Sequence, residues 1–220
     1  MIFEVAGLTV RVHGESGYLR ALCADHISAS EPELTVTLEQ TDPLEQSIEL
    51  LRQVNDALIE RNTFLMHCSA LALDGQGYLF AAHSGTGKST HAAMWRQEFG
   101  DRVTMVNDDK PFIRITDGGV FVCGSPWRGK HNLGANICVP VKALCFLERG
   151  QSDRIFGISP ARALDSIFDQ IPRSPDPAYT LRLLELLDSL LTRVPLYRLE
   201  CTPTKAAART AFFGMNGDKL

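Results

Sequence analysis

Several features are missing from this sequence of 220 residues, and each absence excludes a class of protein. None of its six cysteines forms the C-x-x-C pair of zinc sites and redox motifs, and the two closest lie seven positions apart. Six scattered cysteines also do not make the dense framework of a disulfide-rich secreted scaffold. We therefore expect reduced thiols in a cytoplasmic protein, at Cys23, Cys68, Cys123, Cys138, Cys145 and Cys201.

Targeting and membrane signals are missing too. The first fifteen residues include Glu4 and Arg11, and they lack the basic region and apolar core of a signal peptide. No apolar run approaches the roughly 20 residues that a membrane-spanning helix needs. Repeats and low-complexity tracts are also absent, so the sequence predicts a folded globular chain that does not associate with membranes.

A large positive charge is the third absence. The chain has 22 basic and 26 acidic side chains, a net charge of −4, which argues against a nucleic-acid partner held by bulk charge. The charge is unevenly distributed: residues 1–62 carry 11 acidic and 4 basic side chains, net −7, and residues 63–220 carry 15 and 18, net +3. The second part therefore has the sign that suits a polyphosphate ligand.

The first sixty residues predict a small α/β region. Strand-like runs cover residues 3–12 and 34–38. Asp42, Pro43 and Glu45 form a helix start, and a helix is expected over residues 43–60. Its apolar positions recur at helical spacing and predict the buried face: Leu44, Ile48, Leu51, Val54 and Leu58.

Residues 63–220 predict a larger domain with mixed β-sheets, which makes the fold class α/β (α+β). Asp-Gly turns between apolar runs indicate hairpins. Helices are expected after Ser159-Pro160, Asp176-Pro177 and Thr202-Pro203. The expected strands are 64–66, 70–73, 78–82, 103–106, 112–115, 120–123, 139–147, 155–158 and 195–199.

The strongest functional signal is the segment AHSGTGKST at residues 82–90, between a predicted strand and a predicted helix. A P-loop reads Gly, four residues, Gly-Lys and then Ser or Thr; its backbone N–H groups hold phosphates, its lysine adds charge and its hydroxyl binds Mg²⁺. Ala82 replaces the first glycine of that pattern. The predicted phosphate-binding residues are Ser84, Gly85, Thr86, Gly87, Lys88, Ser89 and Thr90, and Ser89 is a predicted metal ligand. The neighbouring His83 and His91 are interpreted as surface or packing residues.

Two further segments carry charged groups that suit phosphoryl transfer. Asp108 and Asp109 follow an apolar strand, where P-loop enzymes place a Mg²⁺ ligand, and a second acid there can serve as a base. The loop GSPWRGKHN at residues 124–132 offers Arg128 and Lys130 as candidates to stabilise transition-state charge, although a solvated basic loop is an equal alternative. Trp127 is interpreted as a packing anchor.

Together these segments resemble a known family. His67 at the end of one predicted strand, AHSGTGKST and VNDDKPFI are similar to the kinase domain of HPr kinase/phosphorylase and the related ATP-type phosphoenolpyruvate carboxykinase fold. MHCSALAL, GSPWRGK, VPVKALCFLERG and YRLECTP look more like small HPr-kinase-like proteins of peptide-modification clusters, some of which phosphorylate a serine of a precursor peptide. The resemblance covers roughly residues 60–213.

The resemblance implies a P-loop kinase core that uses ATP and Mg²⁺, and it allows a homo-oligomer. It implies that Asp109 is a Mg²⁺ ligand, that Asp108 is the catalytic base and that His67 lies beside it. Thr90 departs from the acid that HPr kinases have after the loop serine, and their signature segment for phosphorolysis is not evident. Phosphorylase activity and HPr as the substrate are therefore not expected, and the chain is too short for a carboxykinase.

The expected function is transfer of the ATP γ-phosphoryl group to a hydroxyl, on a serine of a peptide or protein. Three alternatives stay open: a kinase of a small hydroxy amino acid, a non-catalytic ATP-binding protein and a nucleotide hydrolase. The sequence does not choose among ATP, GTP and pyrophosphate as the donor.

Overall fold

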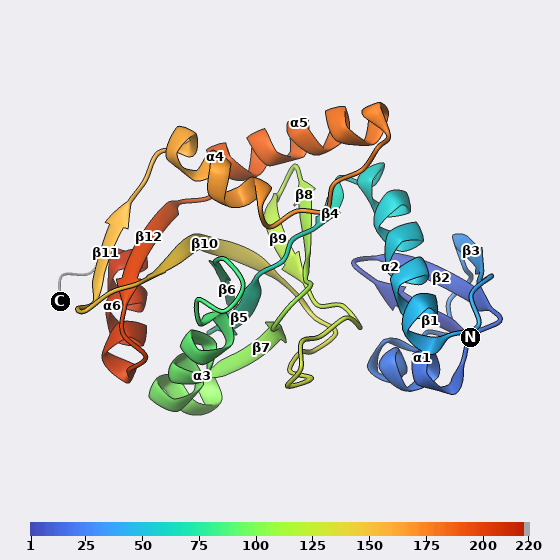
Figure 1. Cartoon of the computed structure of the whole chain (residues 1–220), viewed down its shortest axis with the longest axis horizontal. Coiled ribbons are helices and arrows are strands. Elements are labelled where there is room, and N and C mark those ends of the chain that lie inside the picture. Colours follow the sequence, from blue (N-terminus) through green and yellow to red (C-terminus); the bar gives the residue numbers. More distant parts are fainter. Residues whose placement is uncertain (218–220) are drawn as a thin grey trace.

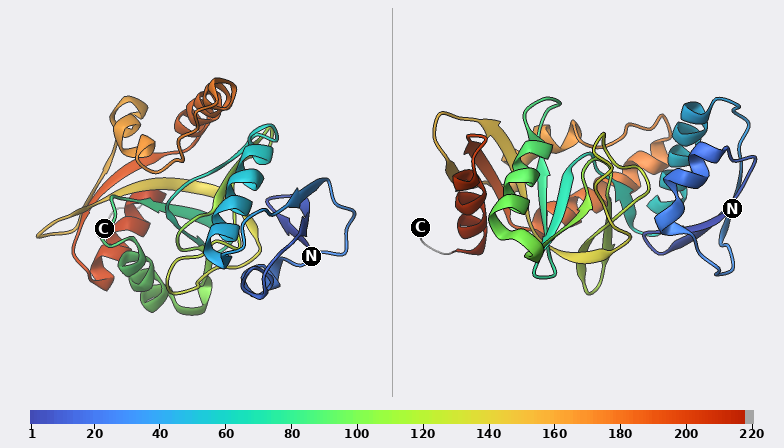
Figure 2. Two further views of the ribbon diagram at one scale, coloured as in Figure 1. Left: turned by 45° about the vertical axis from the view of Figure 1, so that its right-hand side comes forward. Right: turned by 90° about the horizontal axis from the view of Figure 1, so that it is seen from below.

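The computed structural model describes residues 1–217, and its first sixty residues form a layer at one end of the molecule (Figure 1; Figure 2). Three strands make a sheet of order β1-β2-β3, in which β1 and β2 are antiparallel and β2 and β3 are parallel. The long helix α2 connects this layer to the rest of the chain. The elements are β1 (Ile2–Val5), β2 (Leu8–His13), α1 (Gly17–Leu22), β3 (Leu34–Thr37) and α2 (Pro43–Ile59).

This layer differs from the sequence prediction in three ways. The run 3–12 is a hairpin, because Ala6 and Gly7 turn the chain with φ values of 49° and 77°. Helix α1 was not predicted; it has six residues, too few to show helical periodicity. The predicted apolar face of α2 is wrong at its start, since Leu44 is 60% exposed and Ile48 is 54% exposed.

The polar residues Gln46 and Ser47 take the buried positions at the start of α2. The Gln46 amide donates to the carbonyl oxygens of Gly14 and Gln40, at 2.9 and 2.8 Å. Polar groups can be buried at little cost when they are hydrogen-bonded. The spacing of apolar residues could not identify the buried face of α2, because polar side chains occupy the buried positions in its first turn.

The remaining strands form one nine-stranded mixed sheet, which confirms the predicted α/β class. Its strand order is β4-β8-β9-β10-β6-β5-β7, and β12 pairs with both β10 and β11. Strand β10 is long enough to pair antiparallel with β9 at its start and parallel with β6 and β12 further on. The strands are β4 (Thr63–Leu65), β5 (Ser69–Leu73), β6 (Gln76–Ala81), β7 (Val103–Asn107), β8 (Phe112–Thr116), β9 (Gly119–Cys123), β10 (Cys138–Arg149), β11 (Arg154–Gly157) and β12 (Leu196–Cys201).

Helices cover both faces of this sheet. Alternate residues of β6 belong to different cores: Leu79 lies with α4 and α5, whereas Phe80 lies with α3 and α6. Figure 2 shows α3 and α6 side by side in its right view. The helices are α3 (Lys88–Phe99), α4 (Pro160–Phe168), α5 (Pro177–Arg193) and α6 (Lys205–Asn216). None of the helices in residues 1–217 has the length and apolar character needed to cross a membrane.

The expectation of six reduced thiols is wrong for one pair. Cys123 and Cys138 face each other on the antiparallel strands β9 and β10 and form a disulfide, with a Cα–Cα distance of 4.1 Å. They are fifteen positions apart, so only the strand pairing brings them together. The described structure leaves four cysteines free, namely Cys23, Cys68, Cys145 and Cys201.

Candidate active site

The predicted phosphate-binding loop connects the end of β6 to the start of α3. Gly85 and Gly87 have φ values of 77° and 122°, which favour glycine over residues with a side chain. The Thr86 N–H donates to the His83 carbonyl oxygen at 3.1 Å and closes the turn. Gly87 is the N-cap of α3 and supplies no side-chain cap, so the first N–H groups of the helix are available to an anion.

Lys88 lies in the first turn of α3 and bends back over this loop. Its Nζ donates to the Ala82 carbonyl oxygen at 2.9 Å. Burial lowers the pKa of the Lys88 ammonium, and the nearby Cys68 and Asp109 oppose that shift. A half-buried, incompletely neutralised cation beside helix N–H groups is a suitable place for a phosphate chain.

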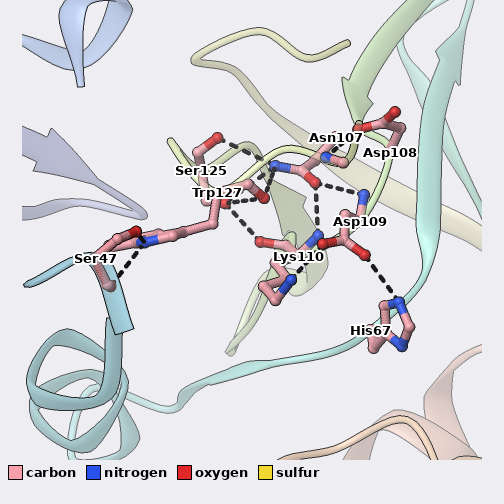
Figure 3. Close-up of polar contacts among 9 residues, drawn as sticks. Ser47, His67, Asn107, Asp108, Asp109, Lys110, Ser125 and Trp127 are labelled. Carbon is pink, nitrogen blue, oxygen red and sulfur yellow. Dashed lines mark hydrogen bonds and ion pairs between the residues drawn. The ribbon is translucent and has the colours of Figure 1, made fainter. Parts of the chain in front are cut away.

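Asp109 forms an ion-pair cluster at the end of β7. Its Oδ1 lies 2.8 Å from His67 Nε2, and its Oδ2 bonds to Lys110 (Figure 3). Burial opposes ionisation of Asp109, but the hydrogen bonds and charges of His67 and Lys110 outweigh it and lower its pKa to about 2. Asp109 is therefore a carboxylate at any physiological pH, as a metal ligand must be.

Asp108 has a different environment from its neighbour, and the two carboxylates point in different directions (Figure 3). Its Oδ1 accepts the Gly129 N–H at 2.7 Å, whereas its Oδ2 is buried and has no hydrogen-bond partner. Burial raises the pKa of Asp108, and the charge of Asp109 adds to the effect. One acid is thus held ionised while the other is poised to accept a proton.

Asn107, which the sequence analysis did not single out, holds this pair in place. Its side-chain oxygen accepts the N–H groups of Asp109 and Lys110, at 2.8 and 2.7 Å. Its amide nitrogen donates to the Ser125 Oγ at 3.0 Å and to the carbonyl oxygens of Ser125 and Trp127 (Figure 3). The fully buried side chain therefore joins the aspartate turn to the 124–132 loop. In the sequence, only its position directly before Asp108-Asp109 could have marked Asn107 as part of the site.

The 124–132 loop contributes its residues to two different places. Trp127 is buried, and its Nε1 donates to the Ser47 Oγ at 3.1 Å and to the Ser47 carbonyl oxygen, which makes it the packing anchor that was predicted. Arg128 bonds through Nη1 at 2.9 Å to Oδ2 of Asp25, a residue of the N-terminal layer. Lys130 is exposed and lines the cavity beside Asp108.

A cavity of about 670 Å³ brings most of the predicted site residues together. Thr86 and Arg128 do not line it. Its size falls within the range of about 300–1,000 Å³ typical of ligand sites. The cavity is lined by His67, Ser84, Gly85, Gly87, Lys88, Ser89, Thr90, Ala93, Asp108, Asp109, Gly129, Lys130 and His131.

The residues that could hold a metal here are Ser89 and Asp109. In residues 1–217 no group of three or more His, Cys, Asp and Glu side chains could hold a metal ion. Mg²⁺ usually binds through one or two carboxylates together with substrate phosphates, so the donor set of one hydroxyl and one ionised carboxylate fits that mode. Lys110 and His67 currently occupy the two oxygens of Asp109.

The histidines around the loop have separate roles. His83 is 78% exposed and lies 3.6 Å from Asp169. His91 is buried and packs against Phe80 and Trp95, so both agree with their interpretation as surface and packing residues. His67, which the resemblance places beside Asp108, is 42% exposed and bonds to the neighbouring Asp109.

Arg149 is a second residue that the sequence analysis missed. It lies at the end of β10, and its Nη2 donates to the Gly85 carbonyl oxygen at 2.5 Å. The same guanidinium lies 3.5 Å from the Thr86 carbonyl oxygen. The parallel pairing of β10 with β6 places this arginine beside the phosphate-binding loop, and no local motif marks it.

These features define an α/β protein with a phosphate-binding loop and a neighbouring aspartate pair. The family model of the SynChlorMet cassette protein ScmC matches residues 33–204, well over half of the chain. The chain belongs to this family. The match includes every predicted site residue.

Two further comparisons are less informative. The HPr(Ser) kinase/phosphatase of Coxiella burnetii is similar in structure at a TM-score of 0.38 and 14% sequence identity, over 70% of this chain and 93% of that chain. No curated protein matches the sequence.

Proposed function

We propose that the protein is an ATP- and Mg²⁺-dependent kinase that transfers the γ-phosphoryl group to a serine hydroxyl of a peptide or protein. The observation that carries the proposal is the buried, unpartnered Oδ2 of Asp108 in the same cavity as Lys88. A carboxylate with a raised pKa in this cavity can accept a proton, which a passive nucleotide-binding site does not need.

In this proposal Asp108 is the catalytic base. Its raised pKa is suited to accepting the proton of an acceptor hydroxyl as that oxygen bonds to the γ-phosphorus, while the bond from the γ-phosphorus to the β–γ bridging oxygen breaks and ADP leaves. Gly129 holds the other oxygen of Asp108 at 2.7 Å and so orients Oδ2. Lys88 and the N–H groups of residues 84–90 stabilise the charge of the transferred group, and the exposed Lys130 adds a second cation.

Bound Mg²⁺ would neutralise part of the phosphate charge. Ser89 and Asp109 would hold it. His67, 2.8 Å from Asp109, acts as a positioning residue for that carboxylate. Arg128 is bonded to Asp25 and acts by fixing the 124–132 loop, rather than by touching the substrate.

The exposure of the site supports a peptide or protein as the acceptor. His67 is 42% exposed, and Lys130 and His131, which also line the cavity, are exposed as well. A free amino acid would be better served by a closed pocket that excludes water. The cavity instead admits a hydroxyl that is carried on a larger chain.

The test is incubation with ATP, Mg²⁺ and a library of serine-containing peptides, with phosphorylation read from the mass gain of one phosphoryl group. Asp108→Asn should reduce turnover by about 10²–10⁴, the usual contribution of a general base. Asp117→Asn, which changes an exposed aspartate in the β8–β9 turn, is the matched control and should keep full turnover. Full turnover by Asp108→Asn would refute the assignment of the base.

A further inference from the structure

Two consecutive residues of the 124–132 loop connect the N-terminal layer to the aspartate pair. Arg128 bonds through Nη1 to the Asp25 carboxylate of that layer at 2.9 Å. The Gly129 N–H donates to Asp108 Oδ1 at 2.7 Å. None of the residues that line the cavity belongs to the N-terminal layer. The layer therefore reaches the proposed base only indirectly, through the segment that orients it.

Asp25 has a well-defined place in the N-terminal layer. It lies in the short 3₁₀ helix η1 (Ala24–His26). The next residue, His26, is fully buried, and its Nδ1 donates to the Glu4 carbonyl oxygen at 2.9 Å. The backbone of the turn is thus anchored in the layer, while the Asp25 side chain is 65% exposed and extends to Arg128.

The Arg128 guanidinium depends on Asp25 more than an arginine at the surface would. Its side chain is only 7% exposed, and its buried Nε and Nη2 atoms have no hydrogen-bond partner. Among residues 1–217, the bond to Asp25 is the only hydrogen bond that this guanidinium makes. Removing one partner of a buried ion pair leaves the other charge uncompensated. Without the Asp25 carboxylate, we therefore expect Arg128 to move toward water.

A movement of Arg128 would displace the next residue, Gly129, relative to Asp108. A Cβ atom at Gly129 would lie 3.2 Å from both carboxylate oxygens of Asp108, so the Gly129 backbone lies directly against the base. Its N–H is also the one donor to that carboxylate within the described part of the chain. Misplacement of a catalytic group by about 1 Å can reduce turnover by about 10². The orientation of Asp108 thus depends on where residues 128–129 lie.

We infer that Asp25 is a positioning residue for phosphoryl transfer. Its carboxylate holds Arg128 in place and thereby keeps Gly129 against the carboxylate of Asp108. This inference rests on the proposed function. It goes further by giving the N-terminal layer, which contains none of the site motifs, a part in orienting the base.

The experiment measures steady-state kinetics with ATP, Mg²⁺ and a serine peptide that the wild type phosphorylates. Asp25→Ala should lower kcat about 10- to 100-fold and leave the KM for ATP unchanged, because Arg128 does not line the cavity. Asp25→Glu keeps the charge and should restore most of the turnover. Glu31→Ala removes another exposed carboxylate of the same layer and is the matched control, which should keep the wild-type kcat.

Two further measurements separate positioning from a general structural role. In the Asp108→Asn background, Asp25→Ala should cause no further loss, because it acts through the base that is already missing. Hydrogen exchange followed by mass spectrometry needs no turnover. In Asp25→Ala, residues 124–132 should exchange faster than in the wild type, while α5 should exchange as before and show that the variant is folded.

Three results would each overturn the inference: a wild-type kcat in Asp25→Ala, the same fold loss in the Asp108→Asn background, or unchanged exchange of residues 124–132. A wild type that phosphorylates no peptide would instead refute the proposed function. Hydrogen exchange would then still decide whether Asp25 fixes the segment next to Asp108.

Discussion

Acid should destabilise this protein through His91, a histidine in the helix that follows the phosphate-binding loop. His91 is 3% exposed and lies among Phe80 and Trp95, and its Nε2 accepts the Trp95 indole N–H at 3.0 Å. A ring nitrogen that accepts this hydrogen bond must be unprotonated. Burial accordingly lowers the pKa of His91 from 6.5 to about 4.

The magnitude follows from the difference between the folded and unfolded states. The unfolded chain takes up a proton on His91 near pH 6.5, whereas the folded chain does so only near pH 4. The stabilisation is therefore complete above pH 6.5 and is lost as the pH falls from 6.5 to 4. At about 1.4 kcal/mol per pKa unit the full loss is about 3 kcal/mol, of which about 2 kcal/mol is lost by pH 5.

Urea unfolding at pH 5, 6 and 7, followed by tryptophan fluorescence, measures this dependence. His91→Gln keeps a neutral acceptor for Trp95 and should reduce the fall in unfolding free energy between pH 7 and pH 5 by about 2 kcal/mol relative to wild type. His83→Gln changes a histidine that is 78% exposed and should keep the wild-type dependence. The same pH dependence in His91→Gln as in the wild type would refute the reasoning.

Three further outcomes follow from the site and its supports. Because the pKa of Asp108 is raised, acid should begin to reduce turnover at a higher pH than it would if the base were an aspartate of ordinary pKa. The residual turnover of Asp108→Asn should lack this pH dependence, and pH–rate profiles of both proteins measure the difference. Asn107→Ala leaves the partly buried N–H groups of Asp109 and Lys110 without their side-chain partner, and chemical denaturation should show a loss of about 2 kcal/mol together with loss of turnover. Replacing Cys123 and Cys138 by serine opens a cross-link between residues fifteen apart and should cost about 3 kcal/mol of unfolding free energy; a double variant as stable as wild type under oxidising conditions would show that the disulfide contributes nothing.

Features encoded over a few neighbouring residues could be predicted from the sequence. The strand, loop and helix around AHSGTGKST follow from local conformational preferences, as do the Asp42 and Asp176 caps of α2 and α5. The α/β class follows from the alternation of apolar runs and turns. Asp108 and Asp109 could be singled out because two acids directly after a buried strand have few roles other than binding or catalysis.

Other features depend on which strands pair, and no local pattern encodes that. The register of β9 with β10 joins Cys123 to Cys138. The parallel pairing of β10 with β6 brings Arg149 to the loop. The exposure of Leu44 depends on how α2 packs, because hydrogen-bonded polar residues can take a buried position from an apolar one.

The aspartate pair shows most clearly which properties come from the sequence alone and which depend on the tertiary structure. The sequence alone determined that two carboxylates stand next to each other after a strand and near a phosphate loop. Only the tertiary structure decided that they differ, by placing His67 and Lys110 on Asp109 and burying Asp108 against Gly129. The physical reason is that a carboxylate's pKa is set by its burial and by the charges around it, and those come from segments distant in the chain.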